Sequence, residues 1–174
     1  MKTEEPSFSD EVRLDRIGAG VERRLEPDAA ARARIAAALE LAELSAFAAD
    51  LKLAPAGQGW RLTGKVVADA VQLCGLTLQP LPVHIEAPVD VSIVEGEPRD
   101  EDEIDIDIEL DDNAPDVVDN GRIDLGAYAV EHLALALDPY PRAPGAEFVQ
   151  PPQPAEVSPF AALAKLKPSD GDKS

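Results

Sequence analysis

The sequence is poor in the residues that build disulfides, metal sites and large aromatic cores. It has one cysteine, Cys74, and two histidines among 174 residues, and aromatic residues make up 4% of the chain. A single cysteine excludes an intrachain disulfide and gives no support to secretion. Two histidines are too few for most catalytic or metal-binding constellations. We therefore expect a modest core of Val, Leu and Ile with one Trp.

Basic residues are also scarce. The chain has 34 acidic and 16 basic residues, for a formal net charge of −18. Lys and Arg bind a nucleic-acid backbone by releasing its counterions, so a chain this acidic is expected to repel RNA. A basic protein partner fits the charge better, because attraction speeds their encounter. Negative charge also keeps a protein soluble, and charge alone does not decide between these two explanations.

Long apolar runs are missing from the sequence. No stretch approaches the about 18 apolar residues that a membrane span needs. Residues 1–10 are polar and charged, whereas a signal peptide has an apolar region. We therefore expect a cytoplasmic protein without membrane contact.

Familiar catalytic motifs are not found either. The sequence contains no GxSxG, no P-loop and no GxGxxG followed by a helix. His84 is predicted on the solvated face of a strand and His132 on a helix flank, where the adjacent Glu131 does not face it. Cys74 is predicted to be a buried, inert thiol, because no base is evident for it. We predict no catalytic residues, no enzyme activity and no cofactor.

Alternation of apolar and polar residues dominates what is present. Such period-two patterns predict β-strands, and a Gly-rich loop at residues 55–59 predicts that two of them form a hairpin. Pro88 interrupts the last pattern and predicts that this strand lies at a sheet edge or is bulged there. The strands are predicted over residues 11–16, 47–53, 60–71 and 83–94.

Two segments have helical spacing of apolar residues, 27–44 and 122–137. Pro27 suits a first helical position, and Asp124 is a good N-cap. Together with the strands, the helices predict an α+β fold in which a mainly antiparallel β-sheet has two helices packed on it. We expect one such domain over residues 1–149.

An acidic segment interrupts this domain at residues 95–119, with 13 acids and one base. Inside it, residues 103–110 read EIDIDIEL, which predicts a strand with isoleucines toward the core and carboxylates on its other face, flanked by mobile loops. Calcium loops need a central glycine that residues 100–112 lack, so no metal site is predicted. The carboxylates form either a solvated edge or a docking surface for a basic partner. We predict partner binding by Asp105, Asp107 and Glu109.

Residues 150–174 are predicted to form an extended C-terminal tail, a Pro-rich linker followed by a short helix at 158–168. Ser158 would cap this helix, and lysines would complement its last turn. So short a helix is not stable alone. Phe160 and Leu163 are therefore predicted to bind a surface, on the same chain or on another molecule.

A Pro-Tyr-Pro-Arg segment follows the second predicted helix, at residues 139–142. It either packs that helix onto the sheet and turns the chain, or presents Tyr140 and Arg142 as a rigid recognition patch. Packing is the simpler explanation. We include both residues among the predicted partner-binding residues.

Three segments resemble the YceD family in their order and spacing: GKVVADAVQLCGLTLQP at 64–80, IDLG at 123–126 and LALALDPYPR at 133–142. The tail sequence SPFAALAKLK resembles that of alphaproteobacterial members. The resemblance implies a role in accumulation of large-subunit ribosomal RNA. Family genes commonly lie beside that of a basic ribosomal protein, which hints at a protein partner. Many members carry a second cysteine where this chain has Thr77, so the resemblance implies no thiol pair or metal here.

Our leading hypothesis is a non-enzymatic acidic factor for large-subunit ribosomal RNA accumulation and ribosome assembly. Its partner would be a basic ribosomal protein or assembly factor, with indirect contact to RNA. A further possibility is that the protein is an enzyme. An enzyme would require a concave pocket with perturbed carboxylates or a histidine pair, and the sequence shows neither. The alternative to the leading hypothesis is direct RNA binding through a small basic patch, for which the candidates are Arg23, Arg24, Arg32, Arg34, Arg61 and Lys65.

Overall fold

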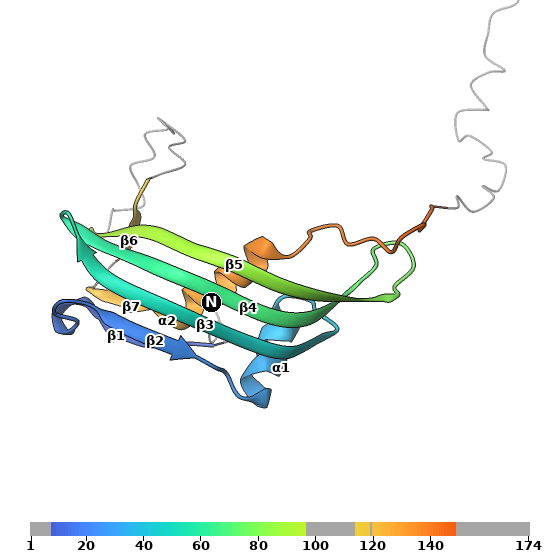
Figure 1. Cartoon of the computed structure of the whole chain (residues 1–174), viewed down its shortest axis with the longest axis horizontal. Coiled ribbons are helices and arrows are strands. Elements are labelled where there is room, and N and C mark those ends of the chain that lie inside the picture. The colour runs from blue at the N-terminus through green and yellow to red at the C-terminus, as the bar shows by residue number, and fades with distance from the viewer. Residues whose placement is uncertain (1–7, 97–113, 119, 149–174) are drawn as a thin grey trace, which may run out of the picture.

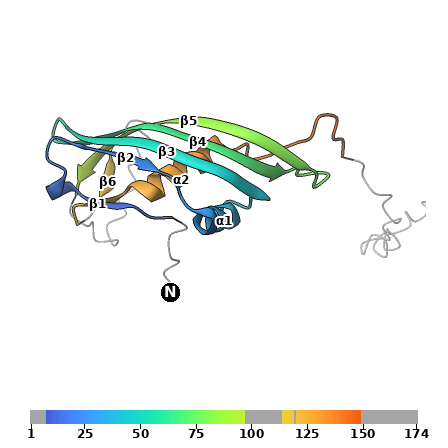
Figure 2. The same ribbon diagram turned by 60° about the horizontal axis from the view of Figure 1, so that its bottom comes forward.

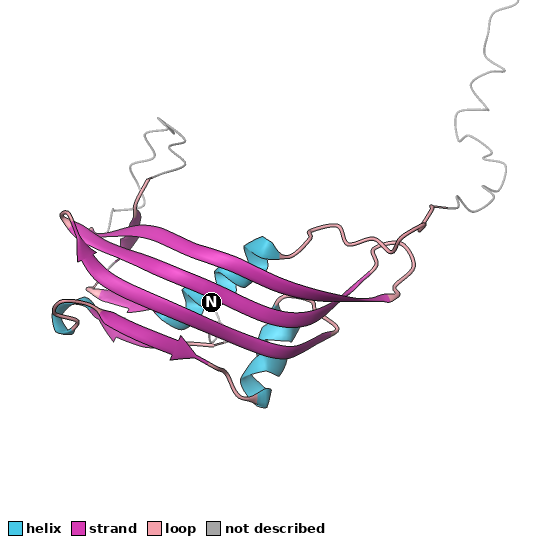
Figure 3. Cartoon of the chain, in the orientation of Figure 1, coloured by secondary structure: helices cyan, strands magenta, loops and turns pink. Residues whose placement is uncertain are grey.

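A five-stranded sheet with two helices on one of its faces forms the body of the protein (Figure 1). The computed structural model describes residues 8–96, 114–118 and 120–148. The α+β class predicted from the sequence is confirmed (Figure 3). The elements are β1 (Glu11–Arg13), the 3-10 helix η1 (Leu14–Arg16), β2 (Val21–Leu25), α1 (Ala29–Ala38), β3 (Glu43–Ala56), β4 (Gly59–Leu73), β5 (Pro80–Glu95), β6 (Asp116–Val118), β7 (Arg122–Asp124) and α2 (Leu125–Ala136).

The sheet is built around the meander β3-β4-β5. Its strand order is β2-β3-β4-β5-β6, with antiparallel pairs throughout except for the parallel pair β5–β6. The predicted hairpin is confirmed: Ala56 pairs with Gly59 across a two-residue turn. Gly57 opens that turn at φ +60°, which glycine adopts without steric cost. A separate two-stranded sheet pairs β1 with β7.

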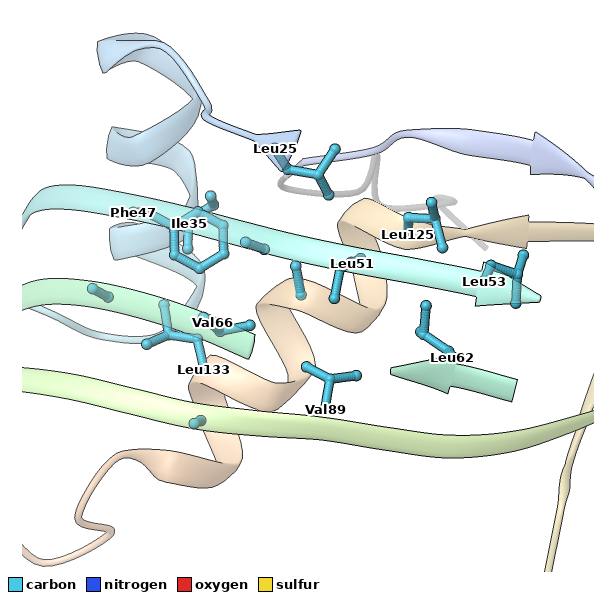
Figure 4. Close-up of a cluster of buried hydrophobic side chains, with 14 of the residues drawn as sticks. Leu25, Ile35, Phe47, Leu51, Leu53, Leu62, Val66, Val89, Leu125 and Leu133 are labelled. Carbon is cyan, nitrogen blue, oxygen red and sulfur yellow. The ribbon is translucent and has the colours of Figure 1, made fainter. Parts of the chain in front are cut away.

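The core lies between the sheet and the two helices. Figure 2 shows α1 and α2 on the same side of the sheet, so neither helix covers the opposite face, which we call the outer face. Ile35 of α1 and Leu133 of α2 are fully buried, and burial stabilises a leucine by about 2 kcal/mol. Figure 4 shows the core side chains. The inner face of the meander contributes Phe47, Ala49, Leu51, Leu53, Leu62, Val66, Ala68, Ala70, Ile85, Ala87, Val89 and Ile93.

Strand β5 lies next to the sheet edge, which is the first of the two alternatives predicted from Pro88. Pro88 pairs with Lys65 without a shift in register, and β6 covers only the last three residues of β5. The Gly96 N–H donates to the Val118 carbonyl oxygen across that edge, with an N···O distance of 3.3 Å. Because strand residues alternate, the even-numbered residues of β5 aim their N–H groups at this edge. Three of those positions are prolines, Pro80, Pro82 and Pro88, which donate no hydrogen bond.

Helix α1 is shorter than the predicted helix 27–44. Asp28 caps its first turn by accepting a 2.7 Å hydrogen bond from the Ala31 N–H, so Pro27 precedes the helix. At its other end, Glu40 has φ +55° and the Leu41 N–H donates to Ala36. This is a Schellman ending, in which glycine is usual at the position that Glu40 occupies. No glycine or proline marks the end in the sequence, which is why the prediction ran too far.

The other predicted boundaries also need correction. The strand predicted over 11–16 ends at Arg13, where η1 begins, and the helix predicted from residue 122 begins at Leu125, after β7. Strand β2 was not predicted, because Arg23 breaks its apolar alternation. Leu44 belongs to β3, where a register shift between Leu44 and Ala46 breaks the pattern. The loops predicted to flank 103–110 include β6 and the end of β5.

Replacement of Gly64 tests the close approach of β3 to β4. Gly64 has φ +154°, and a Cβ atom there would overlap the backbone carbonyl oxygen of Asp50. We expect Gly64→Ala to lower the free energy of unfolding by about 2 kcal/mol or more, measured by urea denaturation. Gly57→Ala is the matched control, because its φ is +60° but nothing lies within 4 Å, and it should cost about 1 kcal/mol. Equal losses in the two variants would contradict the overlap.

Candidate partner-binding surfaces

The acidic segment leaves and re-enters the fold at one corner of the sheet. β5 ends at Glu95, and β6, which follows the segment, pairs with the same end of β5 through Val94 and Val117. Residues 97–113, with ten acids and one base, therefore connect two strands that pair with each other at this corner. The predicted strand 103–110, with Asp105, Asp107 and Glu109, lies outside the described residues.

At the opposite end of the sheet, the β4–β5 turn is joined to the segment that follows α2. The Gln72 side chain donates to the Asp138 carbonyl oxygen at 2.8 Å. The Gly75 N–H donates to the Pro141 carbonyl oxygen at 2.9 Å. These contacts bring together two segments that are 66 residues apart in the sequence. We call this arrangement the turn junction.

Cys74 lies at the centre of the turn junction. Its predicted burial is confirmed, since its side chain has no exposed surface. The sulfur accepts a hydrogen bond from the Ala143 N–H at 3.3 Å. The Thr77 hydroxyl, followed by the N–H groups of Ala143, Leu76 and Thr77, lowers the pKa of the Cys74 thiol to about 6. Burial raises the pKa, but the hydrogen bonds outweigh it. A thiol with a lowered pKa is more reactive than the inert thiol that the sequence predicted.

A groove of about 560 Å³ lies beside the turn junction. Its apolar lining comes from the end of α1, the end of β4 and the end of α2: Leu39, Leu41, Leu73, Leu137, Pro139 and Pro141. The acidic residues Glu40 and Asp138 also line it. Sequence reasoning missed this groove, because it depends on three chain segments that only the fold brings together.

Tyr140 and Arg142 lie at the same end of the molecule as the groove. Tyr140 is 79% exposed, and its backbone N–H donates to the Asp138 carboxylate at 2.9 Å. Arg142 is exposed as well. Leu133, in the helix before this segment, is buried. The packing explanation therefore applies to the helix and not to the side chains of Tyr140 and Arg142. Their contact with a partner stays a prediction, as it does for Phe160 and Leu163, which lie outside the described residues.

The six basic residues considered for RNA binding do not gather on one surface. Arg32 and Arg34 belong to α1, on the helix-covered side of the sheet, whereas Arg24 of β2 and Arg61 and Lys65 of β4 lie on the outer face. Carboxylates neutralise the strand arginines. Arg24 contacts Glu26 at 2.6 Å and Asp50 at 3.1 Å. Arg23 lies 3.8 Å from the Asp10 carboxylate. Arg61 lies 2.7 Å from the Asp90 carboxylate.

His84 lies on the outer face of the sheet, as the alternation predicted. Its Nδ1 atom is 2.6 Å from the Asp69 carboxylate, and its Nε2 atom is 3.7 Å from that of Glu86. The hydrogen bond to Asp69 raises the pKa of His84. The imidazole is therefore held in a cross-strand hydrogen bond, because His84 and Asp69 are directly opposite in the register of β4 and β5.

A family model described as "Large ribosomal RNA subunit accumulation protein YceD" matches residues 62–167. This range contains most of β4, all of β5, the turn junction and the sequence of the tail up to Lys167. Searches of curated proteins and of solved structures found no match. With 10 and 12 residues, α1 and α2 are too short to cross a lipid bilayer.

Titration of the single thiol tests the turn junction. We expect the ultraviolet absorbance of the Cys74 thiolate to appear with a midpoint near pH 6 in the folded protein, and near 9 after unfolding. A lowered folded-state pKa means that ionisation stabilises the fold, so unfolding free energy should rise between pH 6 and 9. Cys74→Ser should remove both the absorbance and this rise. A folded-state midpoint near 9 would show that the sulfur lacks these hydrogen bonds.

Proposed function

We propose that this chain, which belongs to the YceD family and so takes part in the accumulation of large-subunit ribosomal RNA, acts as a non-enzymatic acidic factor in ribosome assembly. Its direct partner would be a basic ribosomal protein or assembly factor, and its contact with RNA would be indirect. Ribosome assembly places the protein in the cytoplasm in this proposal. The observation that carries it is the corner where the acidic segment is attached.

The charge distribution supports a basic protein partner. Residues 97–113 hold ten of the 34 acids and one of the 16 bases, and they connect the paired strands β5 and β6. A concentrated negative field of this kind attracts cationic surfaces and speeds their encounter. It repels phosphates, whose binding depends on Lys and Arg.

The described surface supports a binding role for this chain. In the ranges that the structure describes, no three His, Cys, Asp or Glu side chains gather as a metal site would require. His84 is engaged by Asp69, and the groove at the turn junction is lined mainly by Leu and Pro. Such apolar surface favours contact with a protein.

The turn junction would supply the second part of the interface. Tyr and Arg are enriched among the residues that dominate binding energy, and Tyr140 and Arg142 are both exposed there. The prolines on either side of Tyr140 restrict its backbone, so little conformational entropy is lost on binding.

Neutralising the acidic segment tests the proposed mechanism. We expect the triple variant Asp105→Asn, Asp107→Asn, Glu109→Gln to weaken capture of basic ribosomal proteins from a cell lysate by about tenfold, since an exposed charge contributes roughly 0.5 kcal/mol. Large-subunit particles in gradient profiles should fall in parallel. The control Glu43→Gln, Glu131→Gln, Glu147→Gln changes the net charge equally at exposed sites of the domain. Unchanged capture and unchanged profiles in the first variant would refute the mechanism.

Direct binding of RNA is tested with purified components. We expect no gel shift of a large-subunit ribosomal RNA fragment at about 0.15 M salt, because Arg24 and Arg61 are already paired with carboxylates. Repeating the assay at lower salt separates weak electrostatic contact from specific binding. Tight binding by the protein alone that weakens steeply with salt would favour the basic-patch alternative.

A further inference from the structure

We infer that the C-terminal segment 158–167 binds, as a short helix, in the groove of its own chain beside the turn junction. The inference rests on an apolar groove that the described residues leave open, and on an apolar segment too short to form a stable helix alone. It concerns this chain alone and does not depend on the identity of any partner.

The groove offers the surface that an amphipathic helix requires. Leu39, Leu41 and Leu137 are each only partly buried, although they pack against the core. Leu73 is 40% exposed. These leucines come from three elements and face one hollow of about 560 Å³. Covering them with another apolar side chain would remove apolar surface from water at both partners.

The chemistry of the rim fits a basic occupant. Glu40, which lines the groove, holds a left-handed backbone at φ +55°, where glycine would be less strained. Asp138 lines the groove as well. Two acidic residues in the lining of an apolar groove complement a segment that combines apolar and cationic side chains.

The tail sequence has this combination. Phe160 and Leu163 are three residues apart, so a helix would place them on the same face. Lys165 and Lys167 follow within the same segment. A helix of this length gains its stability from a surface that it contacts. The family match ends at Lys167, so it includes this whole segment with the domain.

The chain is long enough to place the tail in the groove. Ala143 is held at the turn junction by its hydrogen bond to Cys74. The described chain ends at Phe148, five residues later, and residues 149–157 come before the predicted helix. An extended Pro-rich linker spans about 3.1 Å per residue, so these nine residues reach up to roughly 28 Å. A tethered segment also has a high effective concentration at a site within its reach.

Photo-crosslinking in the full chain tests this inference. The purified variant Leu163→p-benzoylphenylalanine should crosslink to residues of the groove, with Leu39, Leu41, Leu73 and Leu137 as the expected acceptors identified by mass spectrometry. In an equal mixture of isotopically light and heavy chains, the products should join peptides of the same label at every protein concentration. Placing the probe at Lys173 instead should give few groove crosslinks.

A charge reversal at the rim makes the test specific. Adding Glu40→Lys should reduce the groove crosslinks several-fold, because it replaces attraction for Lys165 and Lys167 with repulsion. Glu43→Lys is the control, an exposed acid of β3 that does not line the groove. Products that join differently labelled chains would show that the tail of a second copy occupies the groove. Crosslinks elsewhere, or none, would mean that the tail does not occupy the groove and that a partner protein is its occupant. Each of these results would overturn the inference, and none bears on the acidic segment.

Discussion

The one-sided burial of the β3-β4-β5 meander is the constraint on which the rest of the structure depends. Alternation along these strands places leucine, valine and alanine on one face. Other elements must cover that face, because apolar surface is stabilised by removal from water. Both helices lie there, so they leave the opposite face to cross-strand ion pairs such as Arg61 with Asp90. The candidate binding surfaces therefore lie at the two ends of the sheet, where its turns and connections are found.

Small side chains explain how a core with so few aromatic residues is filled. Ala49, Ala68 and Ala87 occupy positions on the inner face where larger residues would hold the helices away. Leu125 and Leu133 of α2 can then reach the sheet. At the start of α2, one carboxylate oxygen of Asp124 accepts from the N–H groups of Asp10 and Ala127. The helix cap thus also helps to hold the residue that precedes β1.

Features that depend on local sequence were predictable. Period-two alternation identified the three long strands, and the N-cap role of Asp124 followed from its place before an apolar helical pattern. Features that depend on distant segments were not. The end of α1 at Glu40 rests on a backbone conformation that the sequence does not mark, and β6 needs its parallel pairing with β5 to form a strand.

The candidate surfaces divide in the same way. Tyr140 was singled out from its flanking prolines, and the structure finds it exposed. The contact between Cys74 and Ala143 spans 69 residues, so no local pattern predicts it. The groove likewise needs three elements at once. The acidic segment is recognisable from composition alone, whereas its attachment at the β5–β6 corner comes from the fold.

The prolines of β5 bear on how this protein behaves in a crowded cell. A long strand beside a sheet edge can template the addition of strands from other chains and so seed fibrils. Pro80, Pro82 and Pro88 remove backbone donors along that side, so an incoming strand could not form a continuous ladder. These prolines therefore protect the side of β5 that the described residues leave unpaired from edge-to-edge association.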